Sequence, residues 1–79
     1  MEQRKIVGIR RVDMKTKDGQ DVRGYKFFVE YEDPNISGVG TDSFFLSDAK
    51  LTGSVPSIGD IVYLYYNRYG RVERVDIVG

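Results

Sequence analysis

The residues with the most chemical potential lie in the stretch "YLYYNRYGRV", residues 63–72, which holds four tyrosines and two arginines. Tyrosine rings stack on nucleic-acid bases, and guanidinium groups bind phosphates or stack on the same rings. Rings at this density also fill the core of a small β-barrel. The stretch is therefore either a base-stacking surface or part of a core, and the elements that carry it decide between the two.

Catalysis and metal binding find little support in the composition. The sequence has no cysteine and no histidine, so the commonest metal ligand and general base, and the thiol nucleophile, are missing. The segment "GVGTDS", residues 38–43, lacks the third glycine and the following helix of a dinucleotide-binding motif. The acidic residues do not follow the spacing of a calcium loop. We expect no enzyme, no cofactor and no metal site.

Length and charge indicate one small domain with unevenly distributed charge. The 79 residues form a single domain, 1–79, with a formal net charge of zero. Residues 1–26 hold eight Lys or Arg and four acids, residues 27–66 hold one and six, and residues 67–79 hold three and two. The two basic ends form one stripe only if the fold brings them together.

No apolar run reaches the length of a signal peptide or a membrane span, which predicts a cytoplasmic protein without membrane contact.

Alternating apolar and polar residues predict five β-strands. The clearest is "YKFFVEYE", in which every second residue is apolar on one face, so that Phe27 and Phe28 point to opposite sides. In the first strand the apolar phase shifts around Gly8, as it does at a β-bulge or a bend. The predicted strands are residues 5–14, 25–32, 41–47, 60–67 and 71–78.

Turn and helix signals separate these strands. Asp18-Gly19 predicts an antiparallel hairpin between the first two strands. At most one short helical turn is expected, near residues 47–52, with Ser47 or Asp48 as its cap. Loops or turns are predicted at residues 33–40, 55–60 and 69–70.

This order of elements is typical of a small five-stranded Greek-key barrel of the OB-fold type, and an SH3-like barrel is the alternative. In an OB barrel the first strand lies beside the fourth. Oligonucleotides cross the face of strands two and three, between the loop joining strands one and two and the loop joining strands four and five. Both of these loops are basic in this sequence.

Several rings are expected on the outside of such a barrel. Phe28 and Phe45 fall on the outer face of strands two and three, where they are either stacking rings or part of a dimer interface. The three tyrosines within residues 63–66 cannot all point inward, so we expect either Tyr65 with Tyr63, or Tyr66 alone, to face outward beside Arg10 or Arg11.

Tyr69 is the best single candidate for a stacking ring, because the tip of a turn offers few neighbours to bury it. Lysines and arginines in the two basic loops would bind phosphates, while the acids at the end of strand two, residues 30–33, limit where nucleic acid can run. The predicted nucleic-acid-binding residues are Arg10, Arg11, Lys15, Lys17, Arg23, Tyr25, Lys26, Phe28, Phe45, Tyr65, Arg68, Tyr69 and Arg71.

Two stretches, "RGYKFFVEYED" and "PSIGDIVYLYYNRYGRVERVDIV", resemble the small single-stranded-DNA-binding proteins of filamentous phages and related mobile genetic elements, over about residues 24–79. Members of that family are short OB-like chains, usually dimeric, that coat replicating single strands cooperatively. The resemblance implies that fold, a homodimer and a role in phage or mobile-element replication. By matching position it implies binding roles for Tyr25, Lys26, Tyr69 and Arg71. The basic, aromatic wing of the family has no counterpart in residues 33–42, which contain no Lys, Arg or ring.

Taken together, the sequence predicts a protein that binds single-stranded nucleic acid, DNA in the first place, with little sequence preference. Rings would stack on bases and basic side chains would follow the phosphates. The alternative is a protein-interaction or homo-oligomeric β-barrel module without a nucleic-acid role, whose outer rings or unpaired edge strand contact another chain.

Overall fold

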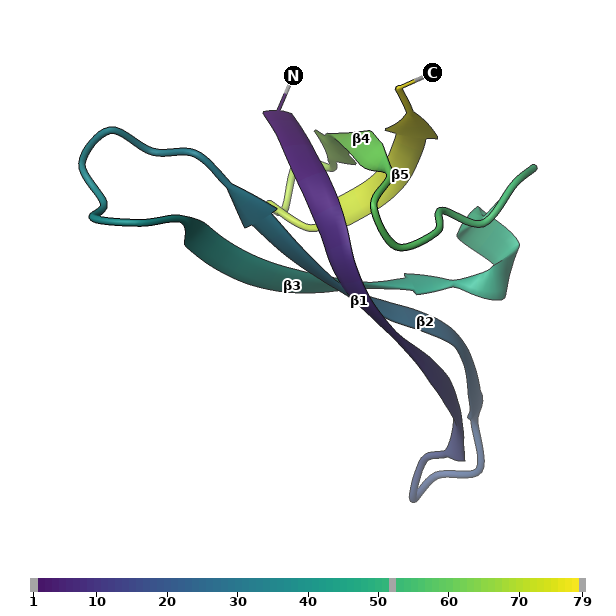
Figure 1. Ribbon diagram of the computed structural model, residues 1–79. Coiled ribbons are helices and arrows are strands. Elements are labelled where there is room, and N and C mark those ends of the chain that lie inside the picture. Colours follow the sequence, from purple (N-terminus) through teal and green to yellow (C-terminus); the bar gives the residue numbers. More distant parts are fainter. Residues whose placement is uncertain (1, 52, 79) are drawn as a thin grey trace.

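The computed structural model describes residues 2–51 and 53–78, and its five antiparallel strands form one sheet (Figure 1). The described elements are β1 (Glu2–Lys15), β2 (Asp21–Tyr31), β3 (Gly40–Ser47), the 3-10 helix η1 (Asp48–Lys50), β4 (Ile61–Tyr66) and β5 (Val72–Ile77). Their order in the sheet is β3-β2-β1-β4-β5. The all-β prediction with five strands and one short helical turn is confirmed, and each predicted strand overlaps an observed one.

β1 is shared between two neighbours, which determines the shape of the sheet. Its N-terminal residues pair with β4, from Glu2 opposite Leu64 to Lys5 opposite Ile61, and its remaining length pairs with β2. A register shift between Ile6 and Gly8 confirms the predicted bulge. The extra residue changes the inward phase of β1 and bends the strand. The sheet can therefore curl, and the C-terminal part of β1 continues into a long hairpin with β2.

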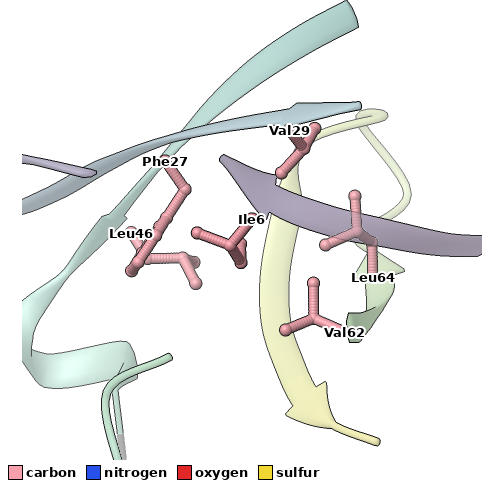
Figure 2. Packing of buried hydrophobic residues seen from close by; sticks show 6 residues of the cluster. All are labelled: Ile6, Phe27, Val29, Leu46, Val62 and Leu64. Carbon is pink, nitrogen blue, oxygen red and sulfur yellow. The ribbon is translucent and has the colours of Figure 1, made fainter. Parts of the chain in front are cut away.

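The core lies on the concave side of this curled sheet. Figure 2 shows the buried side chains pointing toward one another from four strands. They are Ile6 of β1, Phe27 and Val29 of β2, Leu46 of β3, and Val62 and Leu64 of β4. Val72 and Val75 of β5 pack against the same cluster. Because both edge strands contribute to one core, burying these side chains draws the two edges of the sheet toward each other.

The two edge strands do not complete a barrel. β3 and β5 stand at opposite ends of the strand order, and within the described residues no hydrogen-bonded ladder joins them. They nevertheless lie close enough to be in contact. The structure is therefore an open, curled antiparallel sheet, and this is the part of the barrel prediction that it confirms.

The predicted β1–β2 hairpin is present, with its turn at the predicted position. The amide of Thr16 donates to the carbonyl of Gln20 at 2.8 Å, and the amide of Gly19 donates to the carbonyl of Thr16 at 3.0 Å. Gly19 has φ 84°, a value that suits glycine, so the Asp-Gly signal was informative. Figure 1 shows this hairpin projecting away from the rest of the sheet.

The helical turn after β3 is shorter than predicted. It is a single 3-10 turn with Ser47 at the N-cap position, and the Ser47 side chain makes no capping hydrogen bond within the part of the chain that the structure describes. An ion pair from Asp48 to β1 holds the turn instead. The observed turn lies at the end of β3, beside the gap between β3 and β5.

Candidate nucleic-acid interface

Strands β1, β2 and β3 place a compact basic and aromatic surface on the convex side of the sheet. In the strand registers Arg10 lies opposite Lys26, and Lys26 lies opposite Phe45, so these three side chains form one row across three strands. In the adjacent row Phe28 lies between Gly8 and Ser43. We call the surface formed by Arg10, Lys26, Phe28 and Phe45 the outer face.

The two rings of the outer face are held by glycines on neighbouring strands. A Cβ at Gly8 would lie 3.3 Å from the ring of Phe28, and a Cβ at Gly24 would lie 2.7 Å from Cζ of Phe45. Each ring thus covers a position without a side chain, yet Phe28 is 38% exposed and Phe45 is 39% exposed. The predicted outward placement of both rings is confirmed, and the rings are supported from below while part of their surface stays accessible.

Charge on the outer face is positive at its centre and negative at one end. The Nζ atom of Lys26 lies 5.5 Å from the centroid of the Phe28 ring, and Arg10 is exposed beside it. At the C-terminal end of β2, Glu30 and Glu32 line a separate depression together with Arg4 and Lys5. The middle of the outer face therefore attracts a polyanion, and the end of β2, where two acids balance two basic residues, offers it no net positive charge.

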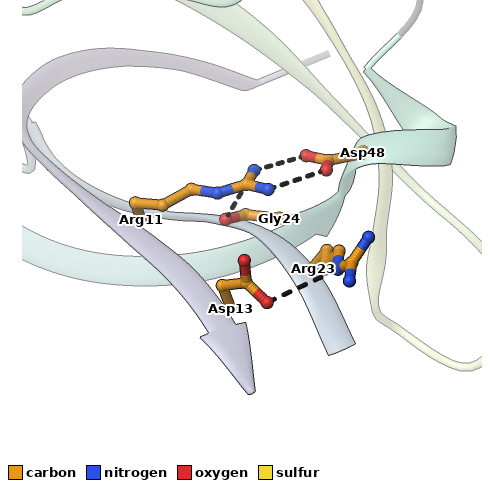
Figure 3. A network of polar contacts seen from close by, with 5 residues as sticks. All are labelled: Arg11, Asp13, Arg23, Gly24 and Asp48. Atoms are coloured by element: carbon orange, nitrogen blue, oxygen red, sulfur yellow. Dashed lines mark hydrogen bonds and ion pairs between the residues drawn. The ribbon is translucent and has the colours of Figure 1, made fainter. Parts of the chain in front are cut away.

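Tyr25 and Arg11 lie on the opposite, core-facing side of the same strands. Tyr25 packs against the core cluster, and the guanidinium carbon of Arg11 lies 4.9 Å from the centroid of its ring. Figure 3 shows that Arg11 reaches across to Asp48 of η1, with hydrogen bonds of 2.7 and 3.0 Å, and donates to the carbonyl of Gly24 at 3.4 Å. Both residues were predicted to bind nucleic acid, and the structure gives each a partner within the protein.

The Arg11–Asp48 pair shifts the ionisation of both groups. The hydrogen bonds from Arg11 lower the pKa of the Asp48 carboxyl below its ordinary value, and the hydrogen bonds to Asp48 raise the pKa of Arg11. In each case the mutual charge attraction acts in the same direction, and desolvation opposes it. Both side chains stay largely solvent-accessible, so this is a surface ion pair with two-point geometry.

The basic residues of the β1–β2 hairpin lie away from the outer face. Lys15 and Lys17 are exposed at the end of the hairpin, which in Figure 1 projects far from the β4–β5 turn. Nε of Arg23 lies 3.4 Å from a carboxylate oxygen of Asp13 on the facing strand (Figure 3). The structure therefore does not bring the two predicted basic loops together, and their roles in binding stay predictions.

The β4–β5 turn presents Arg68 and Tyr69 and is held by hydrogen bonds to the side chain of Asn67. The side-chain oxygen of Asn67 accepts from the amide of Tyr69 at 2.8 Å and from that of Arg71 at 3.1 Å. The Tyr69 ring is 75% exposed, and the guanidinium carbon of Arg68 lies 5.3 Å from its centroid. The prediction of an exposed ring at a turn tip is confirmed, and the fixed turn lowers the conformational entropy that a stacking ring would lose on binding.

Tyr63 and Tyr65 of β4 face outward, which is the first of the two expected arrangements, but they lie beside different neighbours from those expected. Val62 and Leu64 are in the core, so the alternation turns Tyr63 and Tyr65 to the other side. The expected contact with Arg10 or Arg11 is wrong, because β4 pairs with residues 2–5 of β1. The hydroxyl of Tyr63 instead accepts from Gln3 Nε2 at 3.0 Å. Tyr65 lies opposite Arg74 of β5, whose guanidinium carbon is 4.1 Å from the ring centroid.

Where β3 and β5 approach each other, a shallow depression extends the outer face. Its lining includes Phe45 of β3, Lys50 of η1 and Arg71 at the start of β5. The structure thus joins the predicted residues Phe45 and Arg71, which are far apart in the sequence. Lys50 was missed by the sequence reasoning. The signal for it was its position as the only basic residue in residues 27–66, just after the third strand.

Other kinds of site find no support in the described residues. Within residues 2–51 and 53–78 no group of three or more acidic residues could hold a metal ion. The same residues include no helix with the length and apolar character needed to cross a bilayer.

Comparison with known proteins gave no match among family models, curated proteins or solved structures. The resemblance to phage single-stranded-DNA-binding proteins therefore stays an expectation.

Proposed function

We propose that this protein binds single-stranded nucleic acid on the outer face, by stacking bases on Phe28 and Phe45 and binding phosphates with Arg10, Lys26 and Arg71. The observation that carries the proposal is the row of Arg10, Lys26 and Phe45 across three paired strands. Exposed rings separated by cations match the chemistry of a single strand, whose bases offer π-faces and whose backbone offers regularly spaced anions. DNA without strong sequence preference is the first ligand class, since stacking tolerates every base.

The fold that we propose for this function is an OB-like barrel. Three features support it: β1 divides its pairing between β2 and β4, the helical turn lies between β3 and β4, and β5 lies close to β3. OB-folds are often partly open, and they bind oligonucleotides on the face of strands two and three. The outer face occupies that position. The cytoplasmic location and the role in phage or mobile-element replication are parts of the same proposal.

The test is the binding of fluorescently labelled oligo-dT of about 20 nucleotides, a length that exceeds the usual site of one OB domain. Fluorescence anisotropy at low and moderate salt should show saturable binding that duplex DNA does not displace. The logarithm of the association constant should fall with the logarithm of salt concentration, by about 0.7 for each phosphate contact. No binding at tens of micromolar protein and low salt would refute the proposal.

Two ring variants connect that binding to the site. Phe45→Leu keeps an apolar cover over Gly24 but removes the π-face, and we expect it to weaken binding by about tenfold. The proposed interface also includes Tyr69 at the tip of the β4–β5 turn as an additional stacking ring, so Tyr69→Ala should weaken binding with almost no loss of stability, since this residue is 75% exposed. Ile58→Ala is the matched control, because it removes a side chain that is 68% exposed and lies outside the proposed interface. Equal affinities for Phe45→Leu and the control would contradict stacking on the outer face.

A second candidate function follows from the edges of the sheet. β3 and β5 each have one hydrogen-bonded neighbour in the described sheet, and such edges can pair with a strand of another chain, including a second copy of this one. Light scattering over a range of protein concentrations tests for a homodimer. A stable dimer that forms without nucleic acid, together with failure to bind oligo-dT, would favour this function over the first.

A further inference from the structure

We infer that a single strand bound on the outer face continues across the gap between β3 and β5 to a second subsite at Tyr65 and Arg74, with Lys50 binding the phosphate between the two. This inference rests on the proposed function. It goes further because it assigns a path, a longer binding site, and roles to Lys50 and Arg74.

Lys50 lies where two surface depressions adjoin. It lines the first depression with Phe45 and Arg71, and it also lines a second one with Tyr65 and Arg74. Lys50 is exposed at the end of η1, beside the point where β3 and β5 come close. A lysine side chain is long and its ammonium group has three hydrogen-bond donors. Lys50 can therefore bind the phosphate that links a nucleotide in the first depression to a nucleotide in the second.

The second subsite is built around a stacked pair. Tyr65 and Arg74 lie opposite each other on β4 and β5, with 4.1 Å between the guanidinium carbon and the ring centroid. Arg74 Nη2 also lies 3.4 Å from a carboxylate oxygen of Asp76, which helps to hold the guanidinium group in place. A guanidinium plane fixed on a ring can stack on an unpaired base or donate hydrogen bonds to a phosphate from its edge.

Charge favours this path over the other route from the outer face. Toward the C-terminal end of β2 a strand would meet a depression in which the acids Glu30 and Glu32 balance Arg4 and Lys5. Toward η1 it would meet the cations Arg71, Lys50 and Arg74, with one acid, Glu73, in the lining of the second depression. The lining toward η1 thus carries an excess of positive charge, and the lining at the end of β2 does not, so a polyanion leaving the outer face is attracted toward η1.

Two lengths of oligo-dT separate the subsites, one of about 5 and one of about 15 nucleotides, since sites on OB-folds range from roughly 4 to 16 nucleotides. The shorter strand fits the outer face alone, and the longer one spans both subsites. We expect both Lys50→Ala and Arg74→Ala to weaken binding of the longer strand by roughly threefold to tenfold. Arg74→Ala should leave binding of the shorter strand unchanged, and Lys50→Ala should weaken the shorter strand less than the longer one, because Lys50 also lines the first depression. Each variant should also reduce the slope of the logarithm of the association constant against the logarithm of salt concentration, measured with the longer strand, by about 0.7.

Lys5→Ala is the matched control. It removes one exposed positive charge of β1 from a depression lined by Glu30 and Glu32, and it should change neither affinity. Glu73→Gln supplies a test of the opposite sign, because neutralising the one acid of the second depression should strengthen binding of the longer strand. Arg74→Lys keeps the charge and provides a second variant should Arg74→Ala reduce stability.

Each outcome separates this inference from the proposed function. If Phe45→Leu weakens binding of the short strand, but Lys50→Ala and Arg74→Ala leave the affinity for the longer strand unchanged, the second subsite is refuted and the proposed function stands. Equal losses for both lengths would place Lys50 in the first subsite and would also refute the two-subsite path. Failure of both strands to bind would overturn the proposed function and this inference together.

Discussion

The two faces of β2 use similar residue types for different purposes. On the inner face Tyr25 lies under the guanidinium group of Arg11, and Asp48 closes the arrangement with two hydrogen bonds. On the outer face Lys26 lies near the ring of Phe28, and Phe45 stands in the next strand. Both faces thus hold a cation beside a ring, but within residues 2–51 and 53–78 only the inner pair is joined to a carboxylate.

This difference shows what turns a cation and a ring into a candidate binding surface. A guanidinium group with a two-point carboxylate partner would have to give up that partner to bind a phosphate, which offsets the gain. The rings of the outer face rest on Gly8 and Gly24, so they are positioned without being covered. The inner face stabilises the fold, and the outer face carries our functional proposal.

The largest expected effect compares the neighbouring rings Phe27 and Phe28. Phe27 is fully buried in the core, so Phe27→Ala should lower the free energy of unfolding by about 3–5 kcal/mol. Phe28→Ala removes a partly exposed ring that covers Gly8 and should cost only about 1 kcal/mol. Urea denaturation followed by circular dichroism measures both values.

If Phe27→Ala does not fold, Phe27→Leu replaces it in this comparison, because Phe27→Leu should lower the free energy of unfolding by less than about 1.5 kcal/mol. Similar losses for Phe27→Ala and Phe28→Ala would contradict the assignment of the two rings to opposite faces.

A smaller effect tests the glycines beneath the outer rings. A Cβ at Gly24 would collide with the carbonyl oxygen of Leu46 and lie 2.7 Å from Cζ of Phe45, so Gly24→Ala should destabilise the fold by about 1–3 kcal/mol. A Cβ at Gly8 would meet only side-chain atoms of Phe28, the nearest at 3.3 Å, and that ring can shift. Gly8→Ala is therefore the control and should change stability by less than about 1 kcal/mol. Thermal unfolding of both variants measures the contrast, and equal melting temperatures would argue against close packing of Phe45 on Gly24.

The smallest effect concerns the ion pair of the inner face and its pH dependence. Because the pKa of Asp48 is lowered in the folded protein, its contribution to stability is present above the ordinary carboxyl value of 3.8 and is lost as the pH falls through the lower folded value. Asp48→Asn should therefore be less stable than the parent protein at neutral pH, and the difference should narrow in acid. The urea concentrations at which the two proteins are half unfolded, measured from neutral pH to about pH 3, give the difference in stability. The contributions of the other carboxylates are the same in both proteins and cancel in this difference.

The same variant sharpens the comparison of the two faces. Asp48→Asn leaves every residue of the outer face in place, so its affinity for oligo-dT at neutral pH should equal that of the parent protein. A marked change in affinity would show that Arg11, released from Asp48, takes part in binding after all.

Much of the fold could be predicted because the relevant signals are local. Alternation of apolar and polar residues marked β2, the Asp18-Gly19 turn marked the hairpin, and the phase shift around Gly8 marked the bulge. The closure of the barrel could not be read in this way. It depends on whether β3 and β5 form hydrogen bonds, and neither strand carries a signal for a partner so distant in the sequence.

The candidate site was predictable only in part. The outward placement of Phe28 and Phe45 and the exposure of Tyr69 followed from alternation and from the turn. The engagement of Arg11 could not be foreseen, because Asp48 lies 37 residues further along the chain. Lys50 was missed for the same reason, since its neighbours Arg71 and Arg74 belong to a different edge of the sheet.

By itself the sequence determined which side of the strands within residues 25–32 and 41–47 a residue occupies, the positions of the turns, and the absence of histidine and cysteine chemistry. The tertiary structure alone decided which cations are paired within the protein, which rings rest on glycines, and which basic residues meet across the gap between β3 and β5. The physical reason is that side-chain alternation is a property of one strand. Pairing partners, in contrast, are set by burying one shared core, which requires all five strands at once.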